Sequence, residues 1–134
     1  MTADAVKSTV MRWPLATGAT LALFAVMAGA FGAHGLRSLV SARGLEVFQT
    51  AVTYQIYHSI ALVLVALLAT SGLSRSLLAW AAGFYLAGIL LFSGSLYLLV
   101  LTDLSWPGPV TPIGGACFMV GWALLLAAAL RRNQ

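Results

Sequence analysis

The residues best suited to chemistry in this chain are polar side chains grouped on one sector of an apolar segment. Thr50, Tyr54 and His58 are spaced four residues apart, which in a helix places them in one row, because residues i and i+4 share a face. Gln55 and Tyr57 lie beside this row. Together these side chains present hydroxyls, an amide and an imidazole to a common neighbour. Such a set can form a proton, ion or ligand site, or it can hold helices together by hydrogen bonds.

The segment that carries these side chains has the length of a membrane span. Residues 47–70 contain no charged side chain, and a helix needs about 20 mostly apolar residues to cross a hydrocarbon core about 30 Å thick. His58 then lies near mid-membrane, where an ionisable side chain is a candidate functional residue. Unpaired polar groups are costly in lipid, so we expect His58 to point into protein. Its candidate hydrogen-bond partners are Tyr54 and, on a later span, Ser93 and Ser95.

The composition is that of an integral membrane protein. Hydrophobic residues make up 61% of the chain and charged residues only 7%, with a mean hydropathy of +0.98, whereas soluble domains are roughly a quarter charged. Uncharged segments at 14–33, 47–70, 77–101 and 112–130 predict an all-α fold: one transmembrane domain over residues 1–134, arranged as a four-helix bundle. Residues 34–46 between the first two spans show helical spacing of apolar positions, which predicts a short amphipathic interfacial helix. An ordinary loop is the alternative.

The basic residues predict an orientation. If both termini share a side of the membrane, five of the seven Lys and Arg lie there and only Arg37 and Arg43 lie opposite. Basic residues are enriched on the cytoplasmic side, so we predict cytoplasmic N- and C-termini. The N-terminal segment also resembles a cleaved signal peptide, but the lack of a soluble region downstream favours a retained span. The basic residues form no stripe, so we do not expect nucleic acid as a partner.

A second candidate site lies near the outer membrane interface. His34 closes the first span, and together with Gln49 and the amphipathic segment it could hold a lipid or quinone head group. A haem held by both histidines is disfavoured, because His58 lies about 11 residues, roughly 16 Å, into the second span while His34 lies near the surface. The single cysteine excludes an internal disulfide. No zinc motif, phosphate loop, carboxylate pair or nucleophile set is present, so we predict no cofactor, no metal and no catalytic residue.

Four stretches of the sequence are distinctive in combination. They are GAFGAHGL at 29–36, LEVFQTAVTYQIYH at 45–58, LFSGSLY at 91–97 and TPIGG at 111–115. Through these stretches nearly the whole chain resembles the YgdD-like family of small bacterial inner-membrane proteins. That family is a domain of unknown function related to a small animal transmembrane protein of mitochondrial type. The resemblance implies four membrane helices in a bacterial inner membrane, and it implies no established activity.

Three classes of function fit these observations, and we predict that the protein is not an enzyme. The small size and the absent catalytic set favour an accessory or assembly component of a larger membrane complex. The first alternative is a small oligomeric transporter or channel that uses the polar sector of the second span as its path. The second alternative is a lipid- or quinone-binding membrane protein. The lipid bilayer is the one partner common to all three, with a larger complex or a homo-oligomer as the expected protein partner.

Overall fold

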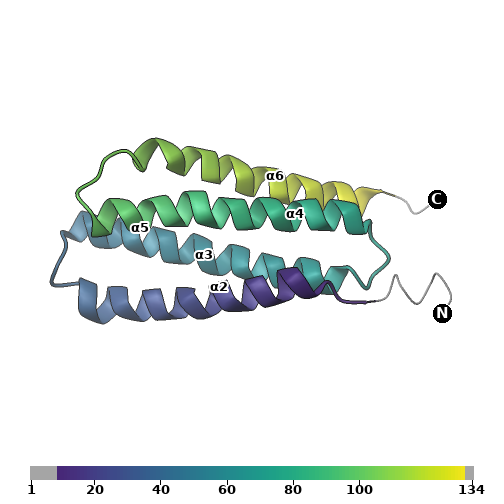
Figure 1. Ribbon diagram of the computed structural model, residues 1–134, viewed down its shortest axis with the longest axis horizontal. Coiled ribbons are helices and arrows are strands. Elements are labelled where there is room, and N and C mark those ends of the chain that lie inside the picture. The colour runs from purple at the N-terminus through teal and green to yellow at the C-terminus, as the bar shows by residue number, and fades with distance from the viewer. Residues whose placement is uncertain (1–8, 132–134) are drawn as a thin grey trace.

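The computed structural model describes residues 9–131, and these residues form four long helical rods with no β-strand among them (Figure 1). Each rod is long and apolar enough to cross a membrane, which confirms the predicted all-α architecture with four spans. The rods are, in order, α2 (Arg12–Phe31) with the π-helical turn η1 (Gly32–Leu36); α3 (Ala42–Leu68); α4 (Arg75–Gly88), the π-helical turn η2 (Ile89–Ser93) and α5 (Gly94–Leu101); and a 3-10 turn η3 (Gly108–Val110) leading into α6 (Thr111–Leu130).

Successive rods run antiparallel, so the first and last described residues lie at the same end of the bundle (Figure 1). The turn between α3 and α4 contains Gly72, whose φ of 82° is the only positive φ among residues 9–131. Glycine adopts this left-handed conformation without the steric cost that other residues meet. Lys7 and Arg132, on which the predicted orientation partly rests, lie outside the described residues.

The connection between the first two rods corrects one prediction. The separate amphipathic helix expected within residues 34–46 is not formed, because the first rod continues to Leu36 and α3 begins at Ala42 after a short turn. Ser41 fixes this start, since its side chain accepts a hydrogen bond of 3.0 Å from the backbone N–H of Gly44. The helical spacing of apolar residues in this segment therefore reflects the ends of two long helices. As a result α3 starts five residues before the predicted position 47.

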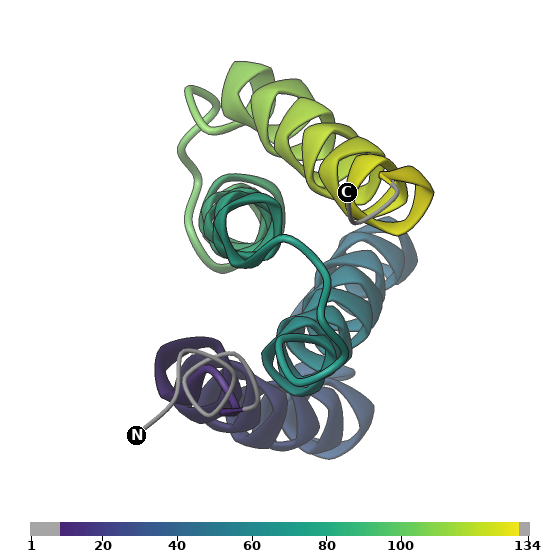
Figure 2. The same ribbon diagram turned by 90° about the vertical axis from the view of Figure 1, so that its right-hand side faces the viewer.

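The rods pack in a chain of neighbours, which Figure 2 shows from the end of the bundle. Helix α3 packs against α2 on one side and against the third rod on the other, while α6 packs on α4 and η2. Small residues permit these approaches. A Cβ at Gly18 of α2 would lie 2.7 Å from the backbone oxygen of Ser59, and a Cβ at Gly121 of α6 would lie 2.7 Å from the ring of Tyr85. Helices α2 and α6 are thus the outer members, and α3 has neighbours on two sides.

Candidate functional site

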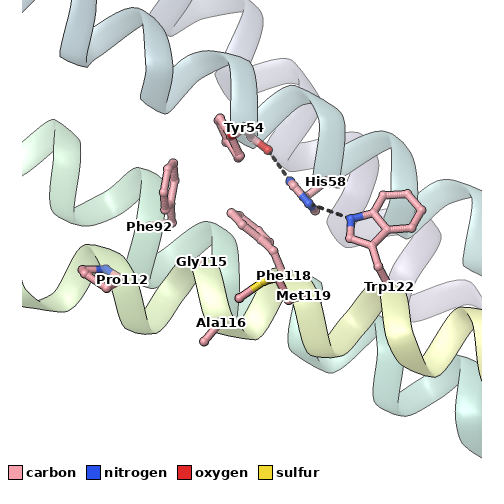
Figure 3. Close-up of a pocket in the computed structure, with 9 residues that line it drawn as sticks. All are labelled: Tyr54, His58, Phe92, Pro112, Gly115, Ala116, Phe118, Met119 and Trp122. Carbon is pink, nitrogen blue, oxygen red and sulfur yellow. Dashed lines mark hydrogen bonds between the residues drawn. The ribbon is translucent and has the colours of Figure 1, made fainter.

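The ring of His58 lies where α3 faces α6 (Figure 3). Its Nδ1 is 2.8 Å from the backbone oxygen of Tyr54, and the indole N–H of Trp122 donates to its Nε2 over 3.1 Å. An indole N–H can only donate, so Nε2 must be the unprotonated acceptor. Nδ1 then carries the hydrogen and donates it to the Tyr54 carbonyl. The two bonds therefore specify a single neutral tautomer of His58.

Aromatic rings enclose the same imidazole. Phe118 stacks on it with ring centroids 3.5 Å apart and an interplanar angle of 12°, and the Tyr85 ring packs against it at 5.7 Å. Only 5% of the surface of His58 is exposed. Phe118 reaches this position because Gly88 of α4 has no side chain, and a Cβ there would overlap the Phe118 ring. The glycine on one helix thus positions the aromatic ring that holds the histidine of another.

Tyr85 adds an unusual feature to this cluster. Its side chain is fully buried, and its hydroxyl has no hydrogen-bond partner within the described part of the chain. Leaving such a group unpaired costs about 1–3 kcal/mol, and an exception of this kind calls for an explanation. The aromatic cluster around His58 therefore contains a hydrogen-bonding group that the fold leaves unused.

A pocket of about 410 Å³ opens beside His58. Tyr54 and Trp122 form part of its wall and are 39% and 45% exposed, and Met119 at its rim is 69% exposed. These residues belong to the membrane-spanning stretches of α3 and α6, so the pocket opens toward the hydrocarbon of the bilayer. Figure 3 shows the lining residues, which are Tyr54, His58, Phe92, Pro112, Gly115, Ala116, Phe118, Met119 and Trp122.

Gln55 faces a different neighbour from His58. Its Nε2 donates to the backbone oxygen of Leu21 on α2 at 2.8 Å, and its Oε1 accepts from the hydroxyl of Tyr97 on α5 at 2.6 Å. The side chain is 5% exposed. Gln55 therefore ties three helices together by hydrogen bonds, and the polar sector predicted on the second span divides into a structural half and a pocket-facing half.

The two serines of the third rod also serve the packing of helices. Ser93 Oγ donates to the backbone oxygen of Ala51 at 2.8 Å, so it joins η2 to α3. Ser95 Oγ lies 2.6 Å from the hydroxyl of Thr111 at the start of α6. Within residues 9–131 neither serine hydrogen-bonds to His58, so the ring takes Trp122 as its interhelical partner in their place.

The other candidate residues lie at the surface of the bundle. Thr50 donates to the backbone oxygen of Glu46 on its own helix at 3.0 Å, and Tyr57 is 60% exposed. His34 in η1 and Gln49 in α3 are both exposed. The structure therefore brings Tyr54 and His58 together at a pocket and leaves the predicted interfacial pair on the outside.

Trp122 is the main site residue that the sequence reasoning missed. The other three tryptophans, Trp13, Trp80 and Trp106, lie close to the ends of the rods, as expected for side chains that favour the membrane interface. Trp122 lies in the middle of α6. A buried or lipid-facing indole usually finds an acceptor for its N–H, so its depth alone could have indicated a polar partner on another helix.

The site holds no recognisable set of metal ligands. Among the residues that the structure describes, no group of three or more His, Cys, Asp or Glu lies close enough to hold a metal ion. The pocket is lined by aromatic and apolar side chains and by neutral hydrogen-bonding groups.

Four spanning helices and a pocket that opens to the hydrocarbon define a small polytopic membrane protein. The chain belongs to the DUF423 family, described as a protein of unknown function, whose profile matches residues 28–115. It is 46% identical to a UPF0382 membrane protein of Staphylococcus aureus (strain bovine RF122 / ET3-1), over 85% of this chain and 92% of the relative. It is 43% identical to the UPF0382 membrane protein YwdK of Bacillus subtilis (strain 168), over 85% of this chain and 93% of that protein. No solved structure matches the chain.

These comparisons confirm the predicted membership of a bacterial family of membrane proteins of unknown function. The relatives named here are bacterial. The YgdD-like name and the relation to an animal protein stay predictions.

Proposed function

We propose that this protein binds a membrane-soluble ligand in the pocket between α3 and α6. The observation that carries the proposal is the pocket itself, whose volume of about 410 Å³ lies beside the buried ring of His58. Binding sites for small molecules have volumes of about 300–1,000 Å³ and apolar linings with few polar groups. The lining of Phe92, Phe118 and Met119 around one imidazole and one indole follows this pattern.

The position of the pocket supports a ligand that arrives through the bilayer. Its rim residues Tyr54, Met119 and Trp122 are exposed on spanning helices, so entry from the hydrocarbon requires no opening of the bundle. Lipid tails, isoprenoid chains and ring-bearing lipids such as quinones have the apolar surface that this lining accepts. The proposal keeps the lipid- or quinone-binding alternative, but it moves the site from His34 and Gln49 to the middle of the membrane.

The transport alternative is less well supported by the same geometry. A path through the bundle needs polar side chains that face one common passage. Gln55 is fully engaged with α2 and α5, while His58 faces α6. Two of the polar side chains on the predicted path of Tyr54, Gln55, His58 and Ser93 therefore face different helices.

Filling the pocket tests the binding proposal. Ala116 is an exposed lining residue of α6, and Ala116→Phe places a ring in the pocket without entering the packed core. We expect the purified wild-type protein to retain a lipid-soluble compound at near one mole per mole. The variant should retain at least about tenfold less, since about 1.4 kcal/mol of lost contact energy suffices for that change. Mass spectrometry of organic extracts measures both values.

Ala123→Phe is the matched control. Ala123 is exposed and lies seven residues after Ala116 on nearly the same face of α6, about two helical turns away, and it does not line the pocket. Its replacement should leave the retained compound unchanged. Equal retention by wild type and both variants would contradict a site in this pocket.

An accessory role in a larger membrane complex is a second proposal, supported by the outer helices. Within Arg12–Leu36 and Gly108–Leu130, only 17% and 22% of the residues in an apolar 18-residue stretch of each span are buried in the single chain. Most of both surfaces is therefore free to contact lipid or another protein. Purification in mild detergent should then give a particle with a second polypeptide in fixed stoichiometry. A particle made of this chain alone would contradict the accessory role and favour a monomer or homo-oligomer.

We also propose a bacterial inner-membrane location with both termini in the cytoplasm. Four spans place both ends on one side, and the basic residues favour the cytoplasm for that side. In a Cys117→Ala background, Ser38→Cys should react with an impermeant thiol reagent added to intact cells. Ser71→Cys in the opposite turn should react only after permeabilisation. The reverse pattern would establish the opposite orientation.

A further inference from the structure

The hydrogen bond between His58 and Trp122 joins two helices across the pocket. Helix α6 packs on α4 and η2, whereas α3 packs on α2 and the third rod. The bond of 3.1 Å from the indole N–H to Nε2 therefore reaches from one pocket wall to the other. A ligand head group that enters between the two walls must either leave this hydrogen bond intact or provide new partners for both the indole N–H and Nε2.

The donor and the acceptor of this hydrogen bond have fixed and opposite roles. The indole of Trp122 can only donate, and Nε2 of His58 can only accept while Nδ1 donates to the Tyr54 carbonyl. A group that inserts between them must accept from the indole and donate to the imidazole at once. In a pocket on membrane-spanning helices, leaving either the indole N–H or Nε2 without a hydrogen-bond partner is costly.

A hydroxyl is the simplest group that meets both requirements. A ketone, ester or quinone oxygen accepts from Trp122 but leaves Nε2 of His58 without a donor. An ammonium group donates to Nε2 but leaves the indole without an acceptor. The buried Tyr85 hydroxyl, which has no partner within residues 9–131, also lies on a ring that packs against His58 and Trp122 at 5.7 and 5.1 Å. The cluster therefore contains one hydroxyl, that of Tyr85, which no described residue pairs.

We propose that the His58–Trp122 pair selects membrane-soluble ligands that carry a free hydroxyl, such as an isoprenoid alcohol or a phenolic lipid. The hydroxyl inserts between the two side chains, donating to Nε2 and accepting from the indole N–H. The apolar chain lies along the small residues Gly115 and Ala116 toward the exposed Met119. This inference rests on the proposed ligand-binding function and names the chemistry of its ligand.

Matched pairs of probes test the selection. Farnesol and farnesyl methyl ether share one chain, and 4-dodecylphenol and 4-dodecylanisole share another, but only the first member of each pair can donate a hydrogen bond. We expect the wild-type protein in nanodiscs to bind at least one hydroxyl compound about tenfold more tightly than its ether, because sites that pair a hydroxyl reject analogues lacking it. The Trp122 indole ¹⁵N–¹H signal, assigned through Trp122→Phe, should shift with the hydroxyl compound.

The variants separate this inference from the function on which it rests. His58→Phe should remove the preference for the hydroxyl while the ether still binds, because only Nε2 of His58 accepts the hydrogen that distinguishes the alcohol from the ether. Trp80→Phe, which changes an exposed tryptophan outside the pocket, should preserve it. Binding without a hydroxyl preference in both pairs would overturn the selection and leave the ligand-binding function standing. Failure of every probe to bind, together with no compound retained by the purified wild-type protein, would overturn the ligand-binding function itself.

Discussion

Gly114→Ala is expected to destabilise the protein by about 3 kcal/mol, the upper part of the range for overpacking a well-packed contact. A Cβ on Gly114 would overlap the backbone nitrogen of Phe92 and lie 2.7 Å from its Cα. Backbone atoms cannot move aside as the end of a flexible side chain can, so α6 must separate from η2. Denaturant titration in detergent micelles measures the loss as a change in the free energy of unfolding.

The neighbouring glycine gives a control on the same helix turn. A Cβ on Gly115 would lie 3.9 Å from the ring of Phe92, which is ordinary van der Waals contact. Gly115→Ala should therefore leave the free energy of unfolding unchanged within about 0.5 kcal/mol, as is usual away from packed features. Equal costs for the two variants would contradict the overlap with the Phe92 backbone as the cause, because helix propensity alone favours Ala over Gly at both positions.

These glycines illustrate how far the sequence determines the fold. Uncharged segments of adequate length predict four spans because the bilayer imposes one simple length requirement. The same sequence does not say which glycine faces a neighbouring backbone. Gly114 and Gly115 are adjacent, but in a helix they point about 100° apart. Gly114 is the one that meets the Phe92 backbone, which lies in the π-helical turn η2, and the hydrophobic pattern of the sequence does not predict that turn.

The candidate site shows a similar limit. The row of Tyr54 and His58 was predictable, because residues i and i+4 share a face wherever the helix lies. Its relation to Gln55 was not predictable, since α3 has neighbours on two sides and a side chain about 100° away meets a different helix. Trp122 is distant in the sequence, and only the packing of α6 on α4 brings it to His58.

Gln55→Leu is expected to cost about 2 kcal/mol of folding free energy. The change removes the donor to Leu21 and leaves the Tyr97 hydroxyl without its acceptor. Interhelical hydrogen bonds in membranes contribute about 0.6–2 kcal/mol each, so two of them account for this value. Tyr97→Phe should cost about 1 kcal/mol, and the double variant should cost little more than Gln55→Leu alone, because both changes remove the same bond. Unfolding titrations of the four proteins give the coupling energy.

Ligand retention distinguishes the structural role of Gln55 from a role in binding. Gln55 does not line the pocket, so Gln55→Leu should lower the yield of folded protein while each folded molecule still retains its ligand. Thr50→Val is the control for loss of a polar group from the same helix, because Thr50 bonds only its own backbone within the described chain, and it should change neither quantity. Additive costs in the double variant would contradict the Gln55–Tyr97 bond. Loss of ligand per folded molecule of Gln55→Leu would instead join Gln55 to the binding site and restore the single polar sector expected from the sequence.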